Sequence, residues 1–239
     1  DLSPSFRSKY KDYLKPGVRG FGYWVWKPYI IYEVLQNLDD DDSLLYVDAG
    51  CRWNMRGISR LEEYFNHLIH EHSGILAFQA KVPDPANSKL KYDGRPLLDL
   101  SVSKWTKGDL LDYFNVRSNE EVMKTQSYGA GILFMQRRNT SMSLLKEWLR
   151  VYEDDFSLAD DSLSKTENAE DFIEHRHDQA IFTLLCIKYN INALSAYEYW
   201  YPAICNVKGV GDWAALNEFP IHAKREKDYG ILLNTARLV

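Results

Sequence analysis

Apolar residues in this chain follow two patterns, short unbroken runs and stripes that repeat with helical spacing. Unbroken runs at 43–47, 74–80 and 129–136 predict strands buried on both faces, and 191–194 predicts a further short strand. Helical spacing predicts helices over 5–13, 28–38, 61–70, 107–114, 141–154 and 178–189. The polar stretches 83–96 and 157–170 are typical of surface loops.

The alternation of strands and helices favours an α/β fold, a Rossmann-like sandwich in which helices flank a mostly parallel central sheet. At 239 residues, the chain fits a single domain over 1–239. Ligands of such sheets bind beyond the carboxyl ends of the strands. Polar residues directly after a strand are therefore the first candidates for a functional site.

The composition excludes several classes of protein. Lys and Arg total 29 and Asp and Glu total 34, and the net charge of −5 disfavours a nucleic-acid partner. No apolar run approaches the ~18 residues of a membrane span, so we expect no transmembrane segment. The 3 cysteines, an odd number and far apart (Cys51, Cys186 and Cys205), argue against a disulfide scaffold and favour a reducing compartment. The 16 Tyr and 7 Trp outnumber the 10 Phe, which favours a site that stacks on sugars or bases.

A carboxylate follows the first expected strand, in the sequence YVDAG at 46–50. Asp48 at that position suits Mg²⁺ or Mn²⁺ held jointly with a substrate diphosphate, or else it simply closes a turn. The acidic run 39–42 precedes the strand rather than following it, so a solvated turn is the better interpretation there.

A second candidate site is the segment 19–28, in which Tyr23, Trp24 and Trp26 lie among the cations Arg19 and Lys27. Aromatic faces stack on sugar faces, and a lysine at a helix start can meet a phosphate beside free backbone amides. The alternative is a core-packing segment whose lysine reaches the surface.

Two more polar segments carry candidate chemistry. The sequence HRHDQ at 175–179 precedes an apolar helix, so Asp178 or Gln179 either caps that helix or, as a carboxylate near imidazoles, Asp178 accepts a proton from an incoming hydroxyl. Near the end of the chain, His222 and Lys224 either bind a metal and a diphosphate or belong to a basic surface turn.

Together these segments resemble a known superfamily. The sequences RGFGYWVWKP at 19–28 and LLYVDAG at 44–50 are similar to the donor-binding half of GT-A type glycosyltransferases. Within that group the bacterial and viral enzymes that build capsule, lipopolysaccharide or related surface glycans are the most similar. Weaker likenesses follow at YGAGIL (128–133), HDQ (177–179) and the pair His222 and Lys224.

The resemblance implies a nucleotide-sugar donor, Asp178 as general base if the enzyme inverts, and Mn²⁺ or Mg²⁺ on Asp48 and His222. In this sequence the DxD-like triplet is DAG at 48–50, without the second carboxylate, so either Asp48 and His222 suffice for the metal or cations alone bind the diphosphate. The donor-binding residues that the resemblance implies are Arg19, Tyr23, Trp24, Lys27, Asp48, Ala49, Gly50, Gly131, His177, Gln179 and Lys224.

Superfamily members begin with a strand that holds the nucleotide base, whereas the first element expected here is a helix. We therefore expect a domain that lacks this strand or holds the base differently. The resemblance also implies a glycan or glycolipid acceptor, a role in surface polysaccharide synthesis, and a cytoplasmic location at the inner face of a membrane. Two other functions fit the same residues: a non-catalytic glycan-binding module, and a glycoside hydrolase that uses Asp48 and Asp178 as its carboxylate pair.

Overall fold

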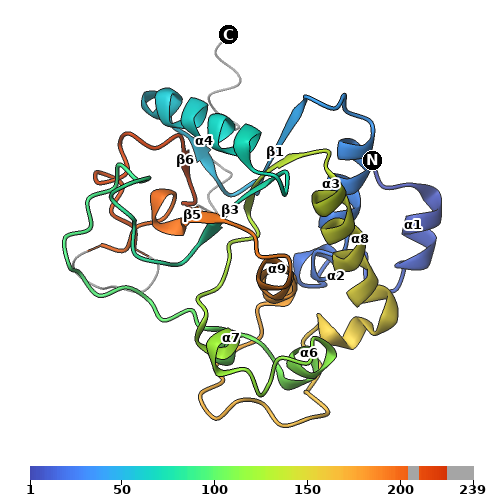
Figure 1. Ribbon diagram of the computed structural model, residues 1–239. Helices are drawn as coiled ribbons and strands as arrows, with labels where there is room; N and C mark the ends of the chain where they lie inside the picture. Colours follow the sequence, from blue (N-terminus) through green and yellow to red (C-terminus); the bar gives the residue numbers. More distant parts are fainter. Residues whose placement is uncertain (204–209, 225–239) are drawn as a thin grey trace.

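A computed structural model describes residues 1–203 and 210–224 of the chain. Its central sheet has the order β1-β4-β3-β5 and is formed by β1 (Ser43–Val47), β4 (Ile132–Gln136), β3 (Ile75–Gln79) and β5 (Ala193–Ser195) (Figure 1). β4 runs antiparallel to both of its neighbours, whereas β3 and β5 are parallel. The α/β class is confirmed, but the expected mostly parallel sheet is wrong because the sheet is mixed.

Burial explains why the strand direction was mispredicted. β3 and β4 are buried along almost their whole length, as their unbroken apolar sequences indicate. Strands of this kind are typical of parallel sheets, because helices cover both faces there. In this protein helices also cover both faces, but of a mixed sheet. The hydrophobic pattern therefore records burial and carries no information on strand direction.

Alternate residues of the central strands face two separate cores. Ile75 and Leu133 pack in the larger core with α3 (Trp26–Gln36), α8 (Asn139–Asp154) and α9 (His177–Lys188). Leu76 and Phe134 pack in the smaller core with α4 (Ile58–His70), which lies on the opposite side of the sheet (Figure 1). This period of two places helices on both faces of the sheet.

The predicted helices at 28–38, 61–70, 107–114, 141–154 and 178–189 correspond to α3, α4, α6 (Gly108–Tyr113), α8 and α9. The helix expected at 5–13 is shorter and ends at Lys9. Among the described residues, no helix is both long and apolar enough to cross a lipid bilayer. The remaining elements are α1 (Pro4–Lys9), α2 (Gly20–Tyr23), β2 (Arg52–Trp53), η1 (Met55–Gly57), α5 (Val102–Trp105), α7 (Glu120–Lys124), η2 (Phe156–Leu158), η3 (Ala196–Glu198) and β6 (Ile221–His222), which pairs with β2.

The polar segment 157–170 is tied to the rest of the protein by many hydrogen bonds. The carboxylate of Asp109, in the first turn of α6, accepts hydrogen bonds from the backbone amides of Lys165 and Thr166, each at 2.9 Å. The buried Lys107 donates to the carbonyl oxygens of Asp160 at 3.2 Å and Ser162 at 3.3 Å. The predicted surface loop is therefore an ordered loop between α8 and α9, held in place by hydrogen bonds.

Candidate functional site

Three charged residues from distant parts of the sequence meet in one cluster, which we call the ion cluster: Lys27, Asp48 and Asp178. Lys27 lies in the first turn of α3, Asp48 directly follows β1, and Asp178 lies in the first turn of α9. The Lys27 ammonium donates to Asp178 Oδ2 at 2.6 Å and to the Ala130 carbonyl at 3.1 Å. It also lies 3.5 Å from Asp48 Oδ1.

Burial differs sharply within the ion cluster. The side chains of Lys27 and Asp178 are 2% and 9% exposed, whereas that of Asp48 is 40% exposed. Burial raises the pKa of Asp178, and the nearby Lys27 ammonium opposes that rise. Asp48 is therefore the most exposed member of the ion cluster, whereas the side chains of Lys27 and Asp178 are buried beneath the surface.

Tyr46, on β1, completes the surroundings of Asp48. Its hydroxyl donates to Asp48 Oδ1 at 2.7 Å, and the Lys27 ammonium lies 5.4 Å from the centre of its ring. Burial and the adjacent carboxylate raise the pKa of Tyr46, so the hydroxyl keeps its proton and remains a donor. Asp48 Oδ1 is thus held from two sides.

The glycine segment 129–131 was expected beside the substrate, and it lies against the ion cluster. The backbone amide of Asp48 donates to the Gly131 carbonyl at 2.8 Å, directly beyond the last paired residues of β1 and β4. A Cβ at Gly131 would lie 2.7 Å from Asp48 Oδ2. A glycine is needed here because any side chain would displace the carboxylate. Ala49 and Gly50 form a turn after Asp48, in which the Cys51 amide donates to the Asp48 carbonyl at 2.9 Å.

The aromatic segment that precedes Lys27 adopts a rare backbone conformation. Five consecutive residues have positive φ, namely Gly20 (59°), Phe21 (51°), Gly22 (92°), Tyr23 (50°) and Trp24 (60°). We call them the left-handed turn. Such a conformation costs roughly 1–2 kcal/mol for each non-glycine residue, and backbone strain of this kind is concentrated at functional sites. The Tyr152 hydroxyl, which donates to the Tyr23 carbonyl at 2.7 Å, holds the turn from inside the core.

The left-handed turn places its rings against His177. The ring centres of Tyr23 and Trp24 lie 5.3 Å and 5.9 Å from that of His177, which itself has a positive φ of 47°. His177 Nδ1 lies 2.7 Å from the Ala159 carbonyl, and burial lowers the pKa of this histidine. The imidazole is therefore a neutral group next to Asp178. Gln179, the next residue of α9, is half-buried.

Arg19 belongs to a more exposed network at the edge of the left-handed turn. Its guanidinium donates to Asp161 at 3.2 Å and to Glu174 at 2.9 Å, and the Tyr23 hydroxyl donates to Asp161 at 3.0 Å. The sequence pattern does not single out Asp161, because an acidic residue in a polar loop carries no recognisable signal. Asp161 belongs to the site through its contacts with Arg19 and Tyr23, which lie more than a hundred positions earlier in the sequence.

His222 lies in β6, and Lys224 follows this strand by two residues. His222 Nε2 lies 2.8 Å from the Leu216 carbonyl, and its ring stacks on Trp213 at 5.7 Å. The Lys224 ammonium lies 5.2 Å from the centre of the Trp213 ring. β6 pairs with β2, and β2 follows the Asp48 turn in the sequence.

The expected divalent cation can be tested against the donor atoms. Across residues 1–203 and 210–224, no group of three or more His, Cys, Asp or Glu side chains is arranged to hold a metal ion. Asp48 Oδ1 already faces an ammonium and a hydroxyl. The described residues therefore offer no site with three or more protein ligands, and an ion held by Asp48, His222 and a substrate diphosphate remains a prediction.

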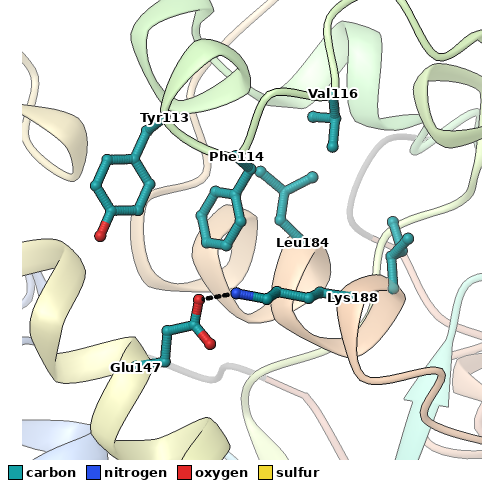
Figure 2. A pocket seen from close by; sticks show the side chains of 7 residues that line it. Tyr113, Phe114, Val116, Glu147, Leu184 and Lys188 are labelled. Atoms are coloured by element: carbon teal, nitrogen blue, oxygen red, sulfur yellow. Dashed lines mark hydrogen bonds and ion pairs between the residues drawn. The ribbon is translucent and has the colours of Figure 1, made fainter.

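One surface pocket lies elsewhere on the molecule (Figure 2). It has a volume of about 390 Å³ and is lined by α6, α8 and α9, and an ion pair between Glu147 and Lys188 crosses it. It shares no lining residue with the ion cluster, so it is not the predicted site.

Cys186 is buried in α9, and Cys205 lies outside the described residues.

Comparisons with known proteins give one structural likeness. No protein-family model matches the chain, and no curated protein matches its sequence. The crystal structure of mouse xyloside xylosyltransferase 1, in its apo form, is similar over 81% of this chain with a TM-score of 0.40 and 10% identity. The matched region is 58% of that glycosyltransferase. A likeness this weak does not define a function, so the function is inferred from the residues of the site.

Proposed function

We propose that this protein is a glycosyltransferase that moves a sugar from a nucleotide-sugar donor to a hydroxyl of a glycan acceptor. The observation that carries the proposal is the ion cluster of Lys27, Asp48 and Asp178. The rings of Tyr23 and Trp24 pack on His177, which directly precedes Asp178. Buried charges are costly, and they are concentrated where chemistry requires them. The rings supply the flat apolar faces on which sugars stack.

In the proposed reaction Asp178 is the general base. Its carboxylate takes the proton of the acceptor hydroxyl as that oxygen bonds to the anomeric carbon of the donor sugar. The bond from that carbon to the diphosphate breaks, and the diphosphate leaves with the electron pair. A base works best when its pKa approaches the working pH, and burial moves the pKa of Asp178 in that direction.

Lys27 has a different part in the proposal from the phosphate contact expected from the sequence. Its ammonium is buried and already contacts two carboxylates and a carbonyl. It therefore acts as the counter-ion that keeps Asp178 ionised. The leaving diphosphate is therefore assigned to Lys224, and no step uses a metal ion.

The Lys27 ammonium also distinguishes the proposed transferase from the two other functions, a glycoside hydrolase and a glycan-binding module. A retaining hydrolase needs one carboxyl group protonated while the other is ionised. The Lys27 ammonium, 2.6 Å from Asp178, favours the ionised form of Asp178, which does not suit Asp178 as the proton donor of such a pair. A glycan-binding module needs the rings and gains nothing from the buried charges. For the acceptor we propose a surface glycan or glycolipid, met in the cytoplasm at the inner face of a membrane.

Donor binding is the first test. We expect at least one UDP-, GDP- or dTDP-sugar, screened with and without Mn²⁺, to raise the melting temperature, and mass spectrometry to detect release of the nucleoside diphosphate. The transferase proposal fails if no donor stabilises the protein. Hydrolysis of aryl glycosides without any donor nucleotide supports the hydrolase instead.

Asp178→Asn tests the base. Loss of a general base lowers turnover roughly 10²- to 10⁴-fold, and we expect donor binding to persist. Asp171→Asn is the matched control, because this exposed carboxylate contacts Ser103 at 3.0 Å, away from the ion cluster. Full turnover by Asp178→Asn would show that the base is assigned to the wrong residue.

A further inference from the structure

Asp161, in the segment that follows η2, contacts three of the residues predicted from the sequence. Its carboxylate accepts hydrogen bonds from Arg19 Nη1 at 3.2 Å and from the Tyr23 hydroxyl at 3.0 Å. Oδ1 also lies 3.5 Å from His177 Nε2. Its side chain is 51% exposed, so Asp161 stands at the open side of the left-handed turn.

The backbone around Asp161 is fixed independently of these contacts. The carbonyl oxygen of Ala159 lies 2.7 Å from His177 Nδ1. The carbonyl oxygen of Asp160 accepts a hydrogen bond from the buried Lys107 ammonium at 3.2 Å. Lys107 also reaches the Ser162 carbonyl at 3.3 Å on the other side. The backbone on both sides of Asp161 is thus held in place by hydrogen bonds, so its carboxylate has a defined position.

We infer that Asp161 is a positioning residue, which fixes Arg19 and Tyr23 and thereby holds the outer face of the left-handed turn against α9. The inference deepens the proposed function and rests on it, because the rings of Tyr23 and Trp24 are the wall on which we expect a sugar to stack. A wall that is already in place when the ligand arrives loses less conformational entropy on binding. Asp161 itself touches no reacting atom.

Glu174 provides a matched comparison. It is a carboxylate of similar exposure, 41%, and it accepts from the same guanidinium at 2.9 Å. Its other ion-pair contact is Arg176, at 3.8 Å, whereas Asp161 reaches the ring-bearing Tyr23. Removing either charge costs Arg19 one partner, so a difference between the two variants reports the contacts of Asp161 with Tyr23 and His177.

Hydrogen exchange in the full chain tests whether Asp161 holds the turn. The amides of Tyr23 and Val25 are hydrogen-bonded within it, to Arg19 at 2.7 Å and Gly22 at 3.1 Å. We expect peptides over 19–25 to exchange roughly tenfold faster in Asp161→Asn, and at the wild-type rate in Glu174→Gln. Tyr23→Phe should give an intermediate rate, and adding it to Asp161→Asn should change the rate little further. Unchanged exchange in Asp161→Asn overturns the inference.

Kinetics separate positioning from a purely structural role. We expect Asp161→Asn to raise KM for one substrate roughly fivefold at unchanged kcat, because Lys27 and Asp178 have their own anchors. A structural role would instead reduce the active fraction, which lowers kcat and leaves KM as it was, and this result refutes positioning. If the wild-type protein turns over no donor, the proposed function fails. The exchange rates then decide alone whether Asp161 holds the turn.

Discussion

Replacing Lys27 by methionine tests the ion cluster most directly. Methionine fills much of the volume of the lysine stem but removes the only charge that balances Asp178 at 2.6 Å within the described cluster. Asp178 then lies in a site where its side chain is 9% exposed, with Asp48 as its charged neighbour. The variant isolates the cost of a buried carboxylate that has lost its counter-ion.

The size of the effect follows from burial. Breaking a buried ion pair by removing one partner destabilises a protein by about 3–5 kcal/mol. For a chain of this length, each kcal/mol lowers the melting temperature by roughly 2–4 °C, so the expected loss is about 6–20 °C. Lys9→Met is the control, because Lys9 and Glu153 form a pair at 2.7 Å whose side chains are 51% and 47% exposed. Exposed pairs contribute about 0–1 kcal/mol.

The effect should depend on pH in a defined direction. Burial raises the folded-state pKa of Asp178, and the Lys27 ammonium opposes this, so removing Lys27 raises that pKa further. The folded variant then binds a proton more tightly than the unfolded chain does. The contribution of Asp178 to the variant's stability is therefore largest at low pH and is lost as the pH rises through the folded-state pKa.

Thermal unfolding by circular dichroism between pH 5 and 8 measures this dependence. We expect the deficit of Lys27→Met to shrink as the pH falls, and Lys27→Met combined with Asp178→Asn to recover much of the loss at pH 8. A deficit below about 1 kcal/mol, or one that is the same at every pH, would falsify the account of the ion cluster.

Three substitutions that add or remove a glycine test the backbone. Phe21→Gly should stabilise the protein by about 1 kcal/mol, because Phe21 has a φ of 51° and its side chain is 44% exposed; a lower melting temperature would contradict this. Gly131→Ala should leave the melting temperature nearly unchanged but reduce turnover, since the new Cβ would meet the Asp48 carboxylate at 2.7 Å; full turnover would argue against a role for Asp48. Gly57→Ala should destabilise the protein by more than about 2 kcal/mol in urea unfolding, because its Cβ would lie 2.3 Å from backbone atoms of Phe219 and Pro220; a neutral result would show that the η1 contact yields easily.

Local features could be predicted from the sequence. Continuous apolar runs located β1, β3 and β4, and the helical period located α4, α8 and α9. The rule that ligands bind after a strand pointed to Asp48, and the polar group before an apolar helix pointed to Asp178. Their meeting with Lys27 was expected only through the resemblance, since no spacing along the chain relates residues 27, 48 and 178.

What could not be predicted depends on three-dimensional contacts. Strand direction is invisible in an apolar run, so the mixed order of the sheet was missed. The left-handed turn was signalled only by Gly20 and Gly22, and nothing marked Phe21, Tyr23 and Trp24 as sharing its conformation. Asp161 gains its place from Arg19 and Tyr23, which are 142 and 138 positions away.

The ion cluster also has a consequence for how the chain folds. The contact between Lys27 and Asp178 spans 151 positions, and β5 joins the sheet through residues 193–195. During synthesis, Lys27 and Asp48 emerge long before the carboxylate that completes the cluster. Contacts this far apart in sequence close late and slow the search for the native state. A nascent chain that ends before α9 therefore cannot assemble the ion cluster.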